Sequence, residues 1–436
     1  MTLSKKPYKG CRDFFPKDMR ERNYLFQAMK ETAESFAYEP FDGPMVEEVE
    51  LYKAKSGEEL INEQIYEFTD RGNRHVAIRP EMTPTVARMV AQIAKQASKP
   101  IRWYSIPNLM RYEKPQRGRL REHWQFNVDI FGAPENLGEI EVLSVVSQLL
   151  ESFGANKDMF SIQLNDRKVV DFIFNQIIAV ESDKSYKLYK IIDKSKKVDL
   201  QALEKMTSEV LTETNQQNAF YEYLGLDTFE KVTNYLKKNN YPHLSEFESF
   251  VGKLRSSQAS EYVQYDPAIV RGLDYYTGVV FEVFDKHPDN KRAIAGGGAY
   301  ANLLQIFNEP ALPGIGFGMG DVTLKDFLIS HNLMPKLDHA QNDVFLSYLT
   351  EQGEALALTT ARSLRQKGLK VETNLGVMKF KKLFKTAEGK GHKNVALIGE
   401  DEVKNNTITL KNMVERKQEI FDVKDIESIT NFLKQG

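Results

Sequence analysis

A loop in the first third of the sequence concentrates positive charge in a pattern suited to phosphate. Residues 111–121, RYEKPQRGRLR, hold one acid, Glu113, among the basic side chains of Arg111, Lys114, Arg117, Arg119 and Arg121. A guanidinium group fixed at the edge of a sheet bonds two oxygens of a phosphate or carboxylate at once. We therefore predict an anion-binding loop; the alternative is a solvated hairpin loop.

The segment after this loop alternates between apolar and polar residues, as a strand with one buried face does. The apolar set is Trp124, Phe126, Val128 and Ile130, and the polar set is Gln125, Asn127 and Asp129. We expect the polar set to face a cavity, because a solvated loop alone gives no reason for two amides and a carboxylate in that strand.

IRPEMTPT, residues 78–85, places polar groups where a predicted strand ends. Arg79 and Glu81 end the strand, and Thr83 is the expected N-cap of a helix whose first position is Pro84. A carboxylate at this point can hold the ammonium group of a substrate. Ordinary capping, with Glu81 near the helix dipole, is an equal alternative.

VRGLDYYTG, residues 270–278, gathers charged and aromatic side chains beside glycines: Arg271, Asp274, Tyr275 and Tyr276. This density is unusual for the start of a strand, and the alternative for the tyrosines is burial with satisfied hydroxyl groups. GGGAY, which begins at Gly296, offers backbone without side chains. Such a segment suits either the close approach of a ligand or a simple turn.

Glycines recur with period two in PGIGFGMGD, at positions 314, 316, 318 and 320. In a strand this spacing leaves one face without side chains, and a flat ring such as adenine fits there. A helix is expected to begin near Asp321, with its positive end toward the same region. Neither of the two common nucleotide-binding glycine loops is present.

A lysine-rich segment near the end of the chain, GVMKFKKLFKTAEGKGHK, interleaves basic and aromatic residues. Its lysines include Lys379, Lys381 and Lys382, and its aromatic residues are Phe380 and Phe384. Lysine with neighbouring aromatic rings suits nucleic acid, through phosphate contact and base stacking. An amphipathic helix with a solvated lysine face is an equal alternative.

Composition limits the classes of function that these segments can serve. The net charge is −2, from 59 basic and 61 acidic residues, so binding of nucleic acid by bulk attraction is excluded and any polyanion site must be local. One cysteine forms no intrachain disulfide, and the seven histidines lack metal-ligand spacing, so no metal site is predicted. The sequence has no signal-peptide pattern and no membrane-spanning stretch, which predicts a cytoplasmic protein.

The periodicities predict an α+β protein. At roughly 100–200 residues per domain, a chain of 436 residues holds two to four domains. We predict an antiparallel catalytic sheet from residues 1–166 and 261–332, interrupted by a lysine-, leucine- and glutamate-rich helical insertion at 167–260, with strands on both sides joining one sheet. Alternating strands and helices predict a separate α/β domain at 340–436.

With these motifs in view, the chain resembles the histidyl-tRNA synthetases, which are class II aminoacyl-tRNA synthetases. KGCRDFFP is similar to the N-terminal signature of that family, and the extended stretch through Pro44 resembles the class motif that builds the dimer interface. RYEKPQRGRLREHWQ resembles the second class motif, which binds ATP and the tRNA acceptor end. RGLDYYTG is the most specific match, because it belongs to histidyl enzymes.

The resemblance implies histidine–tRNA ligase activity with ATP and Mg²⁺, a homodimer, an anticodon-binding C-terminal domain, and Arg111 and Arg271 as catalytic cations. For ATP it implies Arg111, Glu113, Arg119, Arg121, Gly316, Gly318 and Gly320. For histidine it implies Glu81, Thr83, Arg111, Gln125, Asp129, Arg271, Tyr275 and Tyr276. For tRNA, the candidates are Gln116, Arg117, Lys379, Lys381 and Lys382.

The sequence departs from the family at two motifs. Where the family usually reads GGRYD, this chain has Ala299 and Ala301 in place of the Arg and the Asp. The third class motif usually ends with an arginine that meets the ATP γ-phosphate, and Thr323 stands there. Either Arg119 holds the ATP tail or activity is weak, and Asp321 is a candidate Mg²⁺ ligand. The alternative function is a synthetase-like paralogue that regulates histidine biosynthesis.

Overall fold

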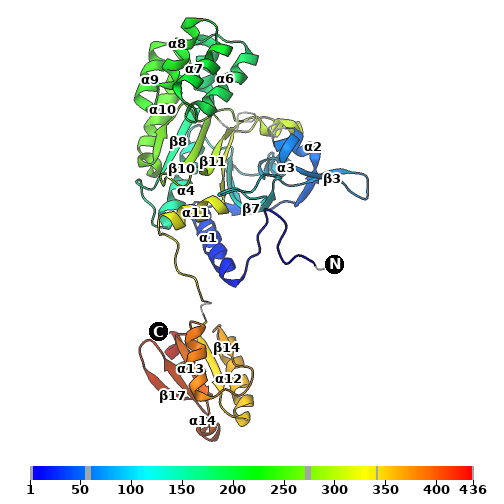
Figure 1. Ribbon diagram of the computed structural model, residues 1–436, viewed down its shortest axis with the longest axis vertical. Coiled ribbons are helices and arrows are strands. Elements are labelled where there is room, and N and C mark those ends of the chain that lie inside the picture. Colours follow the sequence, from blue (N-terminus) through cyan, green and yellow to red (C-terminus); the bar gives the residue numbers. More distant parts are fainter. Residues whose placement is uncertain (1–2, 55–59, 271–275, 340–341, 435–436) are drawn as a thin grey trace. The chain divides into compact units, whose positions relative to one another are not determined.

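The computed structural model describes residues 3–54, 60–270, 276–339 and 342–434. The chain forms two compact units, Met1–Phe14 with Arg22–Pro335 and Phe15–Glu21 with Lys336–Gly436 (Figure 1). Each unit has its own hydrophobic core. Among the described residues, no helix combines the length and apolar character required to cross a bilayer.

The first unit is built on a nine-stranded sheet with the order β1-β5-β7-β12-β11-β10-β8-β9, and β6 pairs with β7. Its strands are β1 (Glu39–Pro40), β5 (Ile101–Ser105), β6 (Asn108–Met110), β7 (Glu122–Phe131), β8 (Phe160–Asp166), β9 (Val263–Tyr265), β10 (Val279–Asp285), β11 (Ala293–Tyr300) and β12 (Gly314–Gly320). Only the pairs β1–β5 and β8–β9 are parallel. As predicted, strands from before and after the helical insertion share one sheet.

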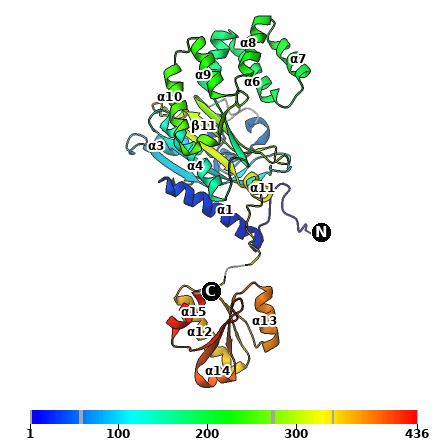
Figure 2. The ribbon, with the colours of Figure 1, turned by 90° about the vertical axis from the view of Figure 1, so that its left-hand side faces the viewer.

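One face of this sheet packs against helices. The helices are α1 (Pro16–Ser35), α4 (Leu137–Ser152) and α11 (Asp321–Ser330), which lie along one side of the sheet in Figure 2. Phe126 and Val128 of β7 and Phe317 of β12 supply the apolar side chains of that face and are almost fully buried. The expected alternation therefore places the apolar set of β7 in the core.

The opposite face carries polar side chains and glycines in register. One row across the sheet is Asn127, Gly318, Gly296, Glu282 and Gln163, and the next is Asp129, Gly316 and Gly298. The glycines that begin at Gly296 therefore lie within strand β11 and not in a turn. A Cβ on Gly297 would lie 2.3 Å from the carbonyl oxygen of Gly316, so only glycine allows the two strands to approach there.

A helical segment connects β8 to β9. Its elements are α5 (Arg167–Phe172), a π-helical turn (Ile173–Ile177), α6 (Ser182–Ser195), α7 (Leu200–Val210), α8 (Thr214–Leu224), α9 (Phe229–Lys238), α10 (Leu244–Arg255) and a 3₁₀ turn (Gln258–Glu261). Side chains of Asp199 and Thr228 cap α7 and α9 by accepting backbone N–H bonds. Buried Phe220 and Tyr223 join this bundle to the core of the sheet.

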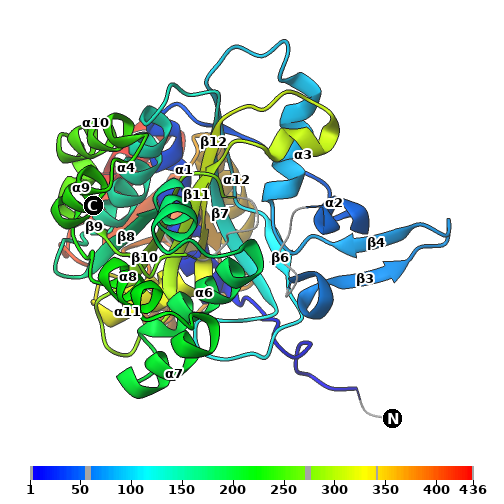
Figure 3. The ribbon, with the colours of Figure 1, turned by 90° about the horizontal axis from the view of Figure 1, so that it is seen from above.

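A smaller three-stranded sheet has the order β2-β4-β3, with β2 (Val46–Glu48), β3 (Tyr66–Thr69) and β4 (His75–Ile78), and its β3–β4 hairpin projects outward in Figure 3. α2 (Val49–Lys53), a π-helical turn (Leu60–Gln64) and α3 (Thr83–Ile93) accompany it. The prediction that Thr83 is the N-cap is wrong. Met82 occupies that position, because its carbonyl already accepts the N–H of Val86 at 2.9 Å. A 3₁₀ turn (Leu303–Phe307) packs on α3.

The second unit is an α/β fold, as the alternating pattern predicts. Its sheet has the order β14-β13-β15-β16-β17, in which β14, β13 and β15 are parallel and the last two are antiparallel. The strands are β13 (Val344–Tyr348), β14 (Val371–Thr373), β15 (Asn394–Ile398), β16 (Thr407–Asn412) and β17 (Gln418–Asp422). The helices are α12 (Glu354–Gln366), α13 (Phe380–Gly389), α14 (Glu400–Asn405) and α15 (Ile426–Lys434), with a 3₁₀ turn at Glu351–Gly353.

Candidate active site

A cavity of about 1130 Å³ opens on the polar face of the large sheet. The loop before β7 supplies Arg111, Glu113, Gln116, Arg117 and Arg119 to its wall. The strands supply His123, Gln125, Gln163, Glu282, Gly296, Gly318 and Gly320, and α11 supplies Thr323 and Asp326. The predicted anion-binding loop therefore borders the cavity together with Gln125, which is the one member of the predicted polar set among the described lining residues.

Backbone hydrogen bonds fix Arg111 at the edge of this cavity. Its N–H donates to the carbonyl of Arg121 at 2.8 Å, and its Nε donates to the carbonyl of Pro80 at 2.8 Å. The second bond brings the guanidinium group beside the turn that carries Glu81 and Thr83. Neither of those two residues is among the described residues that line the cavity.

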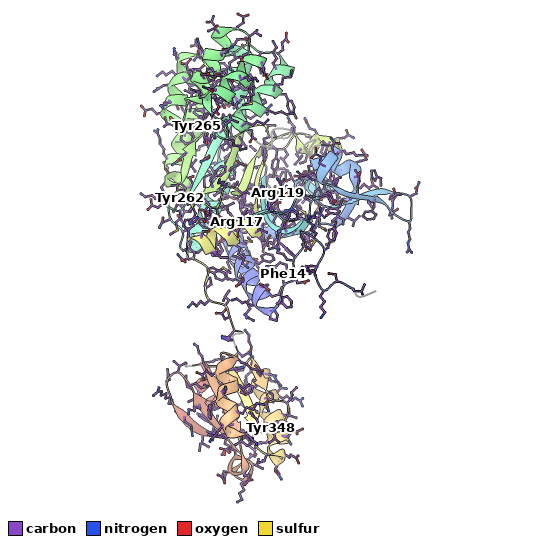
Figure 4. All side chains as sticks on the ribbon, in the orientation of Figure 1. Phe14, Arg117, Arg119, Tyr262, Tyr265 and Tyr348 are labelled. Carbon is purple, nitrogen blue, oxygen red and sulfur yellow. The ribbon has the colours of Figure 1, made fainter. Side chains whose placement is uncertain are left out.

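Glu113 and Arg119 form an ion pair on the cavity wall, with the carboxylate buried. Arg117 is exposed and lies beside α11, where Figure 4 shows it next to Arg119. Burial raises the pKa of Asp326 on α11, and the positive charge of Arg117 opposes that rise. We call Arg111, Arg117 and Arg119 the arginine end of the site.

Arg121 is directed away from the cavity, toward the N-terminal segment. Its Nη1 donates to the hydroxyl of Tyr8 at 2.9 Å, and its guanidinium carbon lies 4.1 Å from the ring centre of Tyr112. Its backbone N–H donates to the carbonyl of Gly10, whose φ is +86° and whose Cβ would lie 2.7 Å from the Arg121 side chain. The structure thus gives Arg121 a role in holding the loop and not a place on the cavity wall.

Only part of the glycine face is open. A Cβ on Gly318 would lie 2.6 Å from the amide of Gln125, and a Cβ on Gly316 would lie 2.4 Å from the carboxylate of Asp129. These two side chains therefore cover the bare face that the sequence suggested for a flat ring. Gly296 is different, because the nearest atoms to its Cβ position are 3.8 Å away.

Asp129 is buried and accepts a hydrogen bond from the hydroxyl of Tyr300, which comes from β11. Burial raises the pKa of Asp129 to about 7, and the Tyr300 hydrogen bond opposes that rise. The ring of Tyr276 lies over Gly298 in the same row, 2.8 Å from the Cβ position of that glycine. Neither Asp129 nor Tyr300 is among the described residues that line the cavity, so we call this pair the carboxylate end of the polar face.

Sequence reasoning missed Tyr300 and also His123, which lines the cavity. Burial, together with the charges of Arg111, Arg12 and Arg119, lowers the pKa of His123 to about 3, so its imidazole is neutral at pH 7. The signal for His123 was its place in the β7 segment directly after the arginines. Tyr300 gave no local signal, and Asn127 donates to the Gln125 carbonyl instead of lining the cavity. Arg271 and Tyr275 lie outside the described residues.

Asp321 has protein partners in place of the suggested metal. One carboxylate oxygen accepts from Arg12 Nη2 at 2.8 Å, and the other accepts from the backbone N–H of Trp124 at 3.0 Å. Within the described ranges, no three His, Cys, Asp or Glu side chains form a group that could hold a metal ion. Asp321 therefore ties the N-terminal segment to β7 and α11.

The predicted tRNA-binding lysines lie at the start of α13 in the second unit. Lys379, Lys381 and Lys382 are exposed, while Leu383 on the opposite side of the helix is fully buried. Phe380 is 53% exposed beside them. The segment is thus an amphipathic helix that presents lysine and an aromatic ring to solvent.

Comparisons with known proteins agree with this arrangement. A family model described as histidyl-tRNA synthetase matches residues 10–322, and one described as anticodon binding domain matches residues 343–434. A histidine–tRNA ligase of Leptospira biflexa is 43% identical over 420 residues, which cover 96% of this chain and 95% of that protein. One from Thermoplasma volcanium is 34% identical over 420 residues, 96% of each chain. This chain belongs to the histidyl-tRNA synthetase family.

Solved structures show the same fold at low sequence identity. Histidyl-tRNA synthetase from Nostoc is 22% identical, with a TM-score of 0.81 over 99% of this chain and 100% of that one. A Bacillus halodurans structure titled ATP phosphoribosyltransferase regulatory subunit/histidyl-tRNA synthetase is 20% identical, with a TM-score of 0.75 over 92% and 99%. The predicted class II catalytic fold and anticodon-binding domain are confirmed.

For a histidyl-tRNA synthetase family member, the position of Thr323 is notable. Its hydroxyl lies 3.1 Å from the carbonyl oxygen of Ile294 and 3.2 Å from that of Gly320. The Thr323 hydroxyl thus donates its proton to a backbone carbonyl, and threonine has no positive charge with which to bind a phosphate. Arg119, the residue that sequence reasoning favoured as a replacement, is already paired with Glu113.

Proposed function

We propose that this protein is a histidine–tRNA ligase. In the first step the carboxylate of histidine attacks the α-phosphorus of ATP, which forms histidyl-adenylate and releases pyrophosphate. In the second step a terminal hydroxyl of tRNA attacks the histidyl carbonyl, which forms histidyl-tRNA and releases AMP. The proposal rests on family membership over nearly the whole chain.

One geometric observation carries the proposal beyond family membership. The polar sheet face has guanidinium groups at one end and a buried carboxylate–phenol pair at the other, with Gln125 between them. Phosphate needs the first kind of group and the cationic or N–H groups of histidine need the second. A site that joins ATP to an amino acid needs both ends on one surface.

The chain's own part in the reaction is positioning and neutralisation of charge. Arg111, fixed by its bond to Pro80, is suited to neutralise the α-phosphate and the attacking carboxylate as negative charge redistributes. Holding the two reactants in line converts a bimolecular step into an effectively unimolecular one. No side chain needs to become covalently linked to substrate.

We propose that histidine is held by Glu81, Thr83, Gln125 and Asp129, with Tyr275, Tyr276 and Arg271 from the signature segment. Asp129 supports this assignment because a carboxylate that faces an N–H or ammonium group offers a charge-assisted hydrogen bond. For ATP we propose Arg111, Glu113, Arg119, Gly318 and Gly320.

We propose that Mg²⁺ binds together with ATP, through the phosphates of the nucleotide. Magnesium usually keeps several waters and binds through phosphates with one or two carboxylates. The cavity wall carries such carboxylates, Glu282 and Asp326 among them, without a group of three within the described residues. This donor set fits an ion delivered with the nucleotide, whose charge would stabilise the leaving pyrophosphate.

Residues 340–436 are proposed to bind the anticodon arm, with Lys379, Lys381 and Lys382 contacting phosphates. Gln116 and Arg117, at the exposed tip of the arginine loop, are proposed to contact the acceptor end. We assign residues 1–166 and 261–332 to the catalytic domain and 167–260 to an insertion in it. We further propose that the protein acts as a homodimer in the cytoplasm.

The second candidate is a synthetase-like regulatory paralogue, and Thr323 is the observation that favours it. The Bacillus halodurans structure shows that the fold alone does not separate the two functions, since its title carries both names. The match to an anticodon binding domain over residues 343–434 favours the ligase, because binding of an anticodon serves aminoacylation.

Exchange of labelled pyrophosphate into ATP separates these candidates. The assay is run with Mg²⁺ and with each of the twenty amino acids in turn, and histidine alone is expected to support exchange. Absence of exchange, with histidine still bound in calorimetry, would contradict the ligase and favour the paralogue. Aminoacylation of tRNA(His) then tests the second step.

A further inference from the structure

We propose that Arg292 binds the terminal phosphates of ATP, at the place where Thr323 offers no charge. This inference rests on the proposed function for the identity of the nucleotide. Arg292 precedes β11, lines the cavity and is half-buried. Sequence reasoning did not single it out.

Three elements converge at this point. Gly118, at the tip of the arginine loop, has a φ of +70°. A Cβ placed on it would lie 3.1 Å from Cδ of Arg292 and 3.4 Å from Cγ2 of Thr323. The side chain of Arg292 therefore runs between the loop tip and the first turn of α11.

An irregularity in the sheet helps to aim Arg292. Val283 of β10 pairs with Ala295, whereas the next residue, Phe284, pairs with Ala293, so Ile294 is an extra residue in β11. Such β-bulges bend a strand and redirect side chains, and they are common beside active sites. The carbonyl of Ile294 also accepts from Thr323, which ties the bulge to α11.

Hydrogen bonds to the side chain of Asp285 hold the turn that carries Arg292. Asp285 is buried and accepts from the backbone N–H of His287 at 2.7 Å and from Asn290 Nδ2 at 2.6 Å. His331, at the end of α11, lies 2.7 Å from the same carboxylate through Nε2. Asn290 also donates to Ser330 Oγ at 3.0 Å. An anchored turn presents a cation with less loss of conformational freedom than a mobile one.

Each of the three residues of the arginine end already has a neighbour in the protein. Arg111 donates to the Pro80 carbonyl, Arg119 pairs with Glu113, and Arg117 is exposed beside Asp326. A triphosphate carries charge along its length and needs cations at more than one point. Arg292 places a further guanidinium group on the same cavity, beside the tip of the loop that holds the other three.

The test compares the affinities of ATP and AMP, measured by calorimetry without histidine or tRNA. Arg292→Ala is expected to weaken ATP binding about ten- to fiftyfold, the effect of losing a charged hydrogen bond, and to leave AMP binding unchanged. Lys286→Ala is the matched control, because Lys286 is exposed, carries the same charge in the same turn and is not among the described residues that line the cavity. It should change either affinity less than threefold.

A second variant places the charge where Thr323 stands. In the Arg292→Ala background, Thr323→Arg is expected to restore preference for ATP over AMP. If Arg292→Ala does not fold, as judged by circular dichroism, Arg292→Lys and Arg292→Gln replace it, and the lysine should retain more ATP preference than the glutamine.

An unchanged ratio of ATP to AMP affinity in Arg292→Ala would overturn the proposal, and so would an equal loss of both nucleotides, which indicates a structural role. If Lys286→Ala weakened ATP binding as much as Arg292→Ala, the effect of Arg292 would be one of general electrostatics and not of phosphate contact. If Thr323→Arg failed to restore the preference for ATP, the proposed position of the terminal phosphates would be rejected. Failure of the proposed function appears separately, as wild-type protein that binds ATP in preference to AMP but shows no histidine-dependent exchange.

Discussion

The arginine end and the carboxylate end border one sheet face, but they are assembled in opposite ways. The arginine end comes from one loop of eleven residues, and its members are fixed by local bonds such as that between the Arg111 N–H and the Arg121 carbonyl. The carboxylate end joins Asp129 to Tyr300 across 171 positions of sequence. The arginine end can therefore be predicted from a short segment of sequence, whereas the carboxylate end forms only when two distant strands pack together.

Their electrostatics differ as well. The arginine end is half-exposed and consists of guanidinium groups. The carboxylate end is buried, and burial raises the pKa of Asp129 to about 7, so its charge depends on pH near neutrality. The comparison therefore predicts large, pH-independent effects at one end and smaller, pH-dependent effects at the other.

The largest effect is expected at Arg111. Replacing it with alanine removes a fixed guanidinium group from the reacting phosphate and should lower histidine-dependent pyrophosphate exchange about 10²- to 10³-fold at every pH. Lys114→Ala is the matched control, because Lys114 is an exposed cation of the same loop and should change the rate little. If Arg111→Ala exchanged pyrophosphate at a rate within threefold of wild type, Arg111 would have no role in the activation step.

The next effect is the pH dependence of histidine affinity. Asp129 is neutral below its pKa of about 7 and charged above it, so an N–H or ammonium group of histidine binds better at higher pH. KM for histidine should rise about tenfold as pH falls from 8 to 6. Asp129→Asn should abolish this dependence, apart from about a fourfold change from titration of the imidazole of free histidine.

The same raised pKa affects stability. In the unfolded chain Asp129 loses its proton near pH 4, whereas in the folded chain it keeps that proton until about pH 7. Its contribution to the free energy of unfolding therefore falls as pH rises from about 4 to about 7, and it is constant above that range. Denaturant titrations should show wild type losing stability relative to Asp129→Asn as pH rises from about 4 to about 7, with no further relative loss above pH 8. Parallel curves would argue against the burial of this carboxylate.

Tyr300→Phe should have a smaller effect, which tests how Tyr300 sets the pKa of Asp129 at the carboxylate end. The Tyr300 hydroxyl lowers the pKa of Asp129 by donating to the carboxylate, so its removal should move the midpoint of the KM profile to higher pH. A shift of about one unit would raise KM for histidine about fivefold at pH 7. Exchange at pH 9 should then match wild type. A uniform loss at all pH values would indicate a packing defect instead.

The smallest effect tests a region away from both ends. Joint replacement of Lys379, Lys381 and Lys382 by alanine should raise KM for tRNA about threefold at physiological salt and more at low salt. Pyrophosphate exchange should not change. The control replaces Lys367, Lys404 and Lys424, which are exposed elsewhere in the second unit. Equal effects of the two triple variants would indicate that the lysines of α13 form a solvated surface and not a tRNA-binding site.

Much of the fold follows from local patterns in the sequence. The period of two in β7 separates Phe126 and Val128 from Gln125 and Asp129, and the structure keeps that division. The helix after Thr83 was misplaced by one residue, because a carbonyl bond from Met82 and not a side-chain cap sets its start. The glycines from Gly296 suggested either the close approach of a ligand or a turn, since composition does not show that a neighbouring strand comes within contact distance.

The sequence by itself determined which residues carry charge, which faces are apolar, and the family to which the chain belongs. Tertiary structure decided which of these groups meet. It turned Arg121 toward Tyr8, covered Gly316 with Asp129 and Tyr300, and placed Arg292 beside Thr323. The physical reason is that hydrophobic periodicity is a property of one segment, whereas burial, and with it the pKa of Asp129, depends on strands that are distant in sequence.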